Sequence, residues 1–211
     1  MVEKRETKRS HTMPLVLMIG YVSRSTPYPG RVMPQETGDY QIIIRKAEIA
    51  DSDGIAEVHV QSWKATYRGL IPDFILDTLS IERRRTLWEN IISVGKSTTL
   101  VLELNGIVAG FVNFGSTRDS DKNPEISAEI TAIYLSPYCW RQGLGRQLCE
   151  VAIAHIACLS FQEVTLWVLD GNERAIRFYQ RMGFYPDGSK KLDQRKELPL
   201  NEVRYVLQLV G

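Results

Sequence analysis

The sequence predicts an α/β domain in which strands and helices interleave around one mixed sheet. Apolar, β-branched runs of strand length recur along the chain, and amphipathic segments with helical spacing separate them. One apolar run ends at Ser136-Pro137, just before a glycine-containing turn that opens a helix. With 211 residues, of which 44% are apolar and 24% are charged, the chain can form one domain with a substantial core.

The first half of this domain is predicted as a strand, two or three helices and a β-hairpin. Ser80 can cap a helix, and Asn105-Gly106 is a strong signal for a two-residue turn between two strands. The expected elements are a strand over 40–46, helices from Asp51 or Asp53 to Tyr67, over 72–79 and over 80–93, and strands over 98–104 and 107–115.

The second half is predicted as strand, helix, strand, helix and two strands. Gly183 fits the position that follows the last turn of a helix. A charged loop is expected over 187–199. The expected elements are strands over 126–135 and 163–169, helices over 143–157 and 173–182, a strand that starts at 184–186, and a closing strand over 202–209.

Two motifs in this second half carry the functional signal. The first, EITAIYLSPYCWRQGLGR, runs from Glu129 to Arg146, and the second, NERAIRFYQRMGF, runs from Asn172 to Phe184. Gly143 and Gly145 stand in a strand–turn–helix junction. Such a junction directs free backbone N–H groups and the positive end of the helix dipole at one point, and that point suits a pyrophosphate.

The pair of motifs resembles the GNAT superfamily of acyl-CoA-dependent N-acetyltransferases over about residues 40–210. The family's pyrophosphate loop reads Arg/Gln-x-x-Gly-x-Gly/Ala. In this chain Trp140 stands at the first position of that pattern, and Arg141 follows it. The second motif matches the family form at Asn172, Ala175, Phe178, Tyr179, Gly183 and Phe184.

The resemblance implies one domain whose mixed, mostly antiparallel sheet is splayed between its fourth and fifth strands, here 126–135 and 163–169, with helices on both faces. Acetyl-CoA would bind in this gap as co-substrate, and no metal is implied. The amide of Leu135 would polarise the thioester carbonyl, an interaction worth about 3 kcal/mol in known enzymes. Asn172 could either bond pantetheine or cap its own helix. The implied cofactor-binding residues are Ile133, Tyr134, Leu135, Arg141, Gln142, Gly143, Leu144, Gly145, Arg146, Asn172, Ala175 and Phe178.

Two side chains are candidates for catalytic proton transfer. Tyr179 matches the tyrosine that acts as general acid in many relatives, and a phenol with a pKa of about 10 is protonated at neutral pH. The alternative is that Tyr179 only packs on a helical face. Glu129 is the candidate that accepts the amine's proton, because burial in a strand can raise the pKa of a carboxylate. The alternative is a solvated or salt-bridged glutamate.

The resemblance implies an enzyme that transfers an acetyl group from acetyl-CoA to a primary amine of a small molecule or peptide, by direct attack in a ternary complex. The alternatives are a non-catalytic acyl-CoA-binding sensor and an acyltransferase that uses another acyl group or an alcohol acceptor. The sequence does not identify the acceptor. Trp63 and Tyr67 could line its pocket or belong to the core, and the run Arg83–Arg85 could attract an acidic acceptor or form a solvated helix face.

The remaining features bound the partners and the ends of the domain. Lys plus Arg is 26 and Asp plus Glu is 25, so the net charge of +1 gives no reason to expect a nucleic-acid or membrane partner. Cys149 and Cys158 are expected to be small core residues, whereas Cys139 lies near the loop. Residues 1–38 are predicted as a flexible leader and linker and 39–211 as the N-acetyltransferase domain; the apolar run over 15–22 could instead dock on the domain. We expect a cytoplasmic location, and a homodimer is left open.

Overall fold

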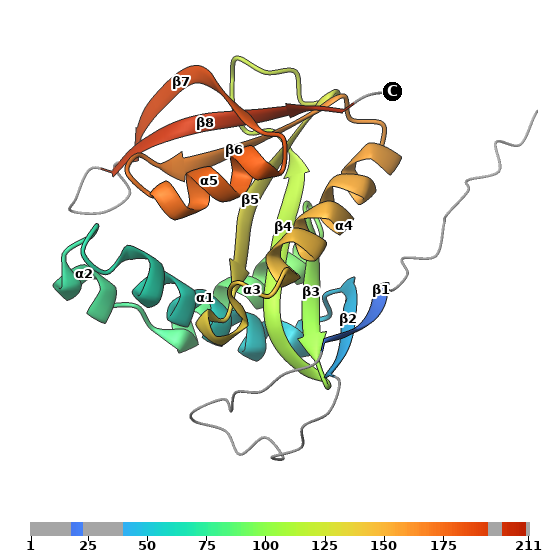
Figure 1. Cartoon of the computed structure of the whole chain (residues 1–211), viewed down its shortest axis with the longest axis vertical. Helices are drawn as coiled ribbons and strands as arrows, with labels where there is room; N and C mark the ends of the chain where they lie inside the picture. Colours follow the sequence, from blue (N-terminus) through green and yellow to red (C-terminus); the bar gives the residue numbers. More distant parts are fainter. Residues whose placement is uncertain (1–17, 23–39, 194–199, 210–211) are drawn as a thin grey trace, which may run out of the picture.

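The computed structural model describes residues 18–22, 40–193 and 200–209. They form an eight-stranded sheet, in the order β1-β2-β3-β4-β5-β6-β8-β7, with helices packed on it (Figure 1). The strands are β1 (Met18–Val22), β2 (Tyr40–Lys46), β3 (Thr98–Leu104), β4 (Ile107–Ser116), β5 (Ser127–Leu135), β6 (Glu163–Leu169), β7 (Tyr185–Asp193) and β8 (Leu200–Gln208). The helices are α1 (Ser52–Tyr67), α2 (Asp73–Asp77), α3 (Ile81–Val94), α4 (Leu144–Cys158) and α5 (Glu173–Arg181), with 3-10 turns η1 (Ile49–Asp51) and η2 (Pro137–Cys139).

The two faces of the sheet bury separate cores. The side chains of Leu100 and Leu102 in β3 point to the face that α4 covers, and the intervening Val101 points to the face that α1 and α3 cover. This alternation follows from the two-residue period of a strand. Leu148 of α4 and Ile55 of α1, one on each face, are fully buried. The predicted fold class, a mixed and mostly antiparallel sheet with helices on both faces, is therefore confirmed.

The sheet opens between β5 and β6, its one parallel pair. Residues pair across this junction only from Ser127–Glu163 to Ile130–Leu166. Beyond that point β5 continues to Leu135 without a partner in β6, whereas β6 stays paired with β8 along its whole length on its other edge. A bulge in the β4–β5 pairing, which leaves Thr131 unmatched, coincides with the point of separation. The splay expected between these two strands is present.

Local signals placed several boundaries correctly. Ser80 accepts a hydrogen bond from the backbone N–H of Arg83 at 3.3 Å and caps α3 as predicted. Asn105 and Gly106 both have positive φ, 49° and 78°, which is the geometry of a tight hairpin turn. Asp51 precedes α1, but its carboxylate accepts from the guanidinium of Arg45 instead of from the first turn of the helix.

The charged loop expected over 187–199 is wrong in its first part, because β7 continues to Asp193. Arg204 of β8 donates to the carboxylate of Asp187 and to the hydroxyl of Ser189, both at 2.7 Å, and so ties this segment to the sheet. Gly188 lies between them with a φ of +88°, at a bulge in the β7–β8 pairing. Residues 194–199 lie outside the described residues.

Part of the predicted leader is placed by the structure. Met18–Val22 forms β1, which pairs antiparallel with β2. This agrees with the alternative that the apolar run docks on the domain. The other residues of 1–38 lie outside the described residues. Among the helices that the structure describes, none is long and apolar enough to cross a membrane. The division at residue 38 stays a prediction.

Candidate active site

The strand–turn–helix junction predicted from the first motif is present at the end of β5. Arg141 and Gly143 both adopt the left-handed conformation, with φ of 63° and 78°, and Gly143 is the N-cap of α4. A glycine cap has no side chain to accept the N–H groups of the first helical turn, which begins at Leu144. These N–H groups and the positive end of the helix dipole therefore remain available to an anion.

Two arginines lie at this corner, and the sequence analysis had singled out only one of them. The guanidinium carbon of Arg174 lies 3.4 Å from the centroid of the Trp140 ring, a close cation–π contact. Burial, and next the nearby charge of Arg141, lower the pKa of Arg174. Among the described residues neither arginine forms an ion pair with a carboxylate. The only sequence signal for Arg174 is its place two residues after Asn172, in the first turn of α5.

Trp140, which departs from the family pattern, holds the turn against β5. Its indole N–H donates to the carbonyl of Leu135 at 3.0 Å, and the hydroxyl of Ser62 donates to the same carbonyl. Trp140 thus takes the place of the Arg or Gln of the family pattern. Its indole bonds the end of β5 and stacks with the guanidinium of Arg174.

The backbone of β5 presents one edge to the gap. The N–H of Ser136 donates to the carbonyl of Ala109 beside β4, at 2.8 Å. Since successive residues of a strand direct their backbone groups to opposite sides, Leu135 and Ile133 direct theirs away from β4, toward the splay. This orientation is compatible with pantetheine pairing and with a role for the Leu135 amide, both of which stay predictions.

The second motif lies beside the first. An added Cβ on Gly145 would stand 3.6 Å from the Leu135 side chain and 3.7 Å from Phe178 of α5. Asn172 is buried, and its side chain accepts from the N–H of Ala175 at 3.2 Å, so it caps α5. The capping interpretation of Asn172 is therefore present in the structure, and a bond to pantetheine stays untested.

Tyr179 is half-buried at the same corner, on α5. Its ring makes edge contacts with Phe178 and Phe184, with centroids 5.3 and 5.9 Å apart. Burial, together with the nearby Cys149 and Tyr134, raises its pKa well above the ordinary value of a phenol. The phenol therefore stays protonated at neutral pH and has a proton to donate, as the role of general acid requires.

The pKa expected for Glu129 is wrong in direction. Burial raises it, but hydrogen bonds and the charge of Arg118 outweigh burial, so the pKa of Glu129 is lowered. The carboxylate is 2% exposed and accepts from the backbone N–H of Arg118 at 3.2 Å and from its Nε at 2.8 Å. The salt-bridged alternative is the one that the structure shows.

Glu129 also lies in the paired part of β5, opposite Thr165 and before the splay. Six residues separate it from Leu135, which is roughly 20 Å along a strand. A role as base would need water or the acceptor itself to span that separation, and it stays a prediction.

The comparisons with known proteins decide the family. A model of the acetyltransferase (GNAT) family matches residues 63–184. The chain belongs to this family. The uncharacterized N-acetyltransferase YuaI of Bacillus subtilis is 32% identical over 139 residues, which is 66% of this chain and 78% of YuaI. The predicted family and enzyme class, an N-acetyltransferase, are thereby confirmed.

Solved structures share the fold of this GNAT chain. The PaiA N-acetyltransferase of Thermoplasma acidophilum, in complex with coenzyme A, has a TM-score of 0.64 at 21% identity and covers 80% of this chain and 99% of its own. The protein yncA of Salmonella typhimurium, solved with acetyl-CoA, has a TM-score of 0.60 at 22% identity and covers 81% of this chain and 95% of its own. The cofactor that the sequence analysis named is thus present in solved relatives of this fold.

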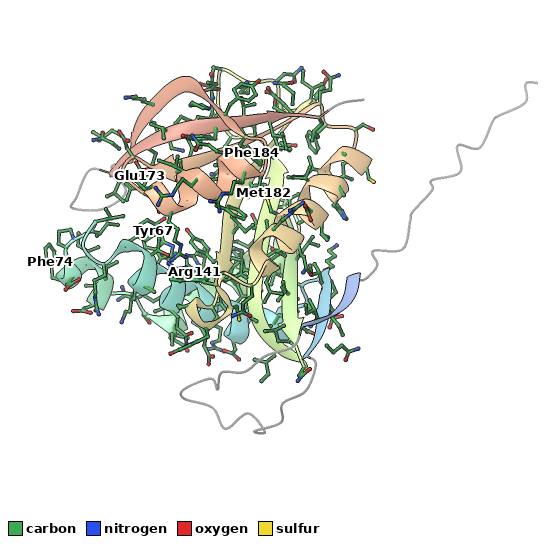
Figure 2. The ribbon with its side chains drawn as sticks, in the orientation of Figure 1. Tyr67, Phe74, Arg141, Glu173, Met182 and Phe184 are labelled. Carbon is green, nitrogen blue, oxygen red and sulfur yellow. The ribbon has the colours of Figure 1, made fainter. Side chains whose placement is uncertain are left out.

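On the other face of the splay, the GNAT domain gathers aromatic side chains. The rings of Trp63 and Tyr67, at the end of α1, have centroids 4.9 Å apart. Tyr134 of β5 stacks on His59 with centroids 5.0 Å apart. Electrostatic interactions connect Tyr67 with both Tyr134 and Tyr179, so phenols from both faces of the sheet converge at the gap. Figure 2 shows Tyr67 and Arg141 in the region between α1 and α5.

Both interpretations of Trp63 and Tyr67 find support in this GNAT domain. They pack on a small core formed by Ile71, Ile75 and Leu76, and they also face Tyr134 at the gap. Sequence reasoning missed Glu202 of β8, whose charge acts on Tyr67 and Tyr134. A single glutamate in a terminal strand carries no local signal, and only the β6–β8 pairing, which sets it beside Leu169, brings it here.

The cysteines of this GNAT domain differ partly from expectation. Cys149 is buried as predicted, and burial raises its pKa to about 12. Cys158 is exposed at the end of α4, so its prediction as a core residue is wrong. Cys139, near the loop, is buried. Within the described ranges, no three His, Cys, Asp or Glu side chains are grouped in a way that could hold a metal ion.

Proposed function

We propose that this GNAT enzyme transfers the acetyl group of acetyl-CoA to a primary amine of a small molecule or peptide, by direct attack within a ternary complex. The observation that carries the proposal is the meeting of three features at one corner: the open edge of β5, the side-chain-free start of α4, and the protonated phenol of Tyr179.

The chain's own residues would hold the donor in two places. The N–H groups of Leu144, Gly145 and Arg146 and the two guanidiniums of Arg141 and Arg174 suit the phosphates of coenzyme A, because they combine donors with positive charge. The edge of β5 at Ile133 and Leu135 suits the amide-containing pantetheine arm, which can pair as an added strand.

The chemical step needs a neutral amine and a protonated leaving group. The amine nitrogen attacks the thioester carbon, the carbon–sulfur bond breaks, and the sulfur takes the proton of Tyr179. The nitrogen releases one proton to water as the amide forms, and Tyr179 regains a proton from water. Burial keeps Cys149 in its thiol form, which does not favour an acyl-cysteine intermediate at that residue. Direct transfer to the amine is the simpler course.

Two measurements test the proposal. Acetyl-CoA should raise the melting temperature by mass action, and ATP at the same concentration should not. Thiol release on mixing acetyl-CoA with a panel of primary amines then separates an enzyme from a non-catalytic acyl-CoA sensor. If acetyl-CoA binds and no amine releases thiol, the amine transfer is refuted, and the sensor and the acyltransferase with another acyl group or an alcohol acceptor are the alternatives left. The cytoplasmic location stays a prediction, and a homodimer stays open.

A further inference from the structure

One half-buried arginine on the acceptor side of the gap has no acidic side chain to pair with among the described residues. Arg84 of α3 is half-buried, and no described carboxylate lies within ion-pair distance of its guanidinium. Its neighbours on the helix differ: Arg83 is exposed, and Arg85 pairs with Glu82 and Glu89. A half-buried guanidinium without a counter-ion has lost part of its hydration, so an anion that pairs with it here is favoured over one at an exposed arginine.

The surroundings of Arg84 place it at the acceptor site. Its guanidinium carbon lies 5.8 Å from the centroid of the Trp63 ring, and its charge interacts with the phenol of Tyr134. Tyr134 in turn lies beside Leu135, at the open edge of β5, and interacts with Tyr179 across the gap. Arg84 is thus connected to the reacting corner through Tyr134, on the face opposite α5.

A carboxylate lies across the gap at the same level. The last residue pair between β5 and β6 is Ile130–Leu166. Three residues beyond it lie Ile133 on β5 and Leu169 on β6, and Leu169 pairs with Glu202 of β8. One carboxylate oxygen of Glu202 is buried and receives no hydrogen bond from the described residues; its ion pair with Lys191 is 3.4 Å long. The acceptor side therefore offers the guanidinium of Arg84 and, across the gap, a carboxylate whose buried oxygen has only the long contact with Lys191.

We propose that the acceptor is an amine that also carries a carboxylate, which Arg84 binds while the amine lies on the Glu202 side. The inference rests on the proposed acetyl transfer. A carboxylate fits because a guanidinium binds it through two parallel N–H bonds, and one positive charge balances one negative charge. A dianionic phosphate fits less well, since Glu202 would repel it and Arg118, whose charge interacts with Glu202, is already paired with Glu129.

The test compares acids with their own amides. A panel of α- and ω-amino acids and the matching amino amides is assayed by thiol release with the wild type, Arg84→Gln, Arg84→Lys and Arg83→Gln. We expect kcat/KM for at least one acid to exceed that of its amide by about tenfold or more in the wild type. Arg84→Gln should lower kcat/KM for that acid by a similar factor, mainly through KM, and leave the amide and the KM of acetyl-CoA unchanged.

Arg83→Gln is the matched control, because it removes the same charge from the same helical turn at an exposed position. Equal losses in Arg83→Gln and Arg84→Gln, or equal use of acids and amides by the wild type, would overturn the inference. Arg84→Lys keeps the positive charge but lacks the planar guanidinium, so its kcat/KM for the acid should lie between the values of the wild type and Arg84→Gln. Circular dichroism shows whether each variant is folded.

Calorimetric titration of the same acids into the wild type and Arg84→Gln, with and without coenzyme A, separates the two proposals. If acetyl-CoA binds but no acid binds more tightly than its amide, this inference fails and the transferase proposal stands. If acetyl-CoA does not bind, the transferase proposal fails, and the difference between wild type and Arg84→Gln in acid binding still decides whether Arg84 holds a carboxylate.

Discussion

Replacement of Gly143 by alanine tests whether the backbone of the loop, and not a side chain, binds the donor. Gly143 has a φ of +78°, and an added Cβ would meet no atom within 4 Å. Steric overlap therefore contributes nothing, and the cost is that of a left-handed backbone at a residue with a side chain, about 1–2 kcal/mol. For a domain of this size that corresponds to a fall in melting temperature of about 2–8 °C.

Gly95→Ala supplies a control with the same backbone cost. Gly95 closes α3 with a φ of +66° and also has no atom within 4 Å of an added Cβ. Gly95→Ala should lose this stability in full, and Gly143→Ala should lose only the part that its loop does not relieve by relaxing. Only Gly143→Ala should bind acetyl-CoA more weakly, because a loop that relaxes in the free protein must regain its strained form on binding.

The affinity change follows from the same energy. If the whole 1–2 kcal/mol is returned on binding, the Kd of acetyl-CoA rises about 5–30-fold in Gly143→Ala and is unchanged in Gly95→Ala. Isothermal titration measures both values, and thermal melts measure stability. An unchanged Kd in a Gly143→Ala protein that is less destabilised than Gly95→Ala would refute the assignment of the loop, because a relaxed loop must regain its strained form on binding.

Three further changes probe the site and its support. Gly145→Glu should abolish detectable acetyl-CoA binding, because the larger side chain meets Leu135 and Phe178 and brings negative charge to the phosphates; unchanged affinity in a titration would contradict this. Tyr179→Phe should lower kcat by about 10²-fold or more with little change in the Kd of acetyl-CoA, and wild-type turnover would leave packing as its role. Arg204→Gln should destabilise the domain by about 3 kcal/mol, because the 3%-exposed guanidinium binds three aspartates that would be left without it.

The Arg204 cluster also sets a dependence on pH. Hydrogen bonding to Arg204 lowers the pKa of Asp121 to about 2, below its value in the unfolded chain. The unfolded state then binds the proton first, so the stabilisation is present above about pH 4 and is lost as the pH falls toward 2. Melting temperatures measured from pH 6 to pH 2 should fall less steeply in Arg204→Gln than in the wild type; parallel curves would show that the cluster does not set the acid sensitivity.

Sequence reasoning succeeded where one short segment contains all of the relevant physics. The strand-length apolar run over 98–104 and the Asn105-Gly106 turn predicted the β3–β4 hairpin, and Gly143 predicted the start of α4. In each case the side-chain period or the φ preference of neighbouring residues is sufficient. It failed over 187–193, where the strand depends on Arg204 from another strand.

For the site, the sequence by itself predicted the family, the strand–turn–helix junction proposed as the donor loop and the tyrosine proposed as the acid, because contiguous motifs encode backbone geometry. Only the tertiary structure decided the state of the charged groups. Arg118 reverses the expected pKa shift of Glu129, and Trp140 stacks with the guanidinium of Arg174. On α3, Arg84 is half-buried while its neighbour Arg83 is exposed. The charge state and the partners of a side chain depend on atoms from distant segments, and no local pattern records where folding brings them.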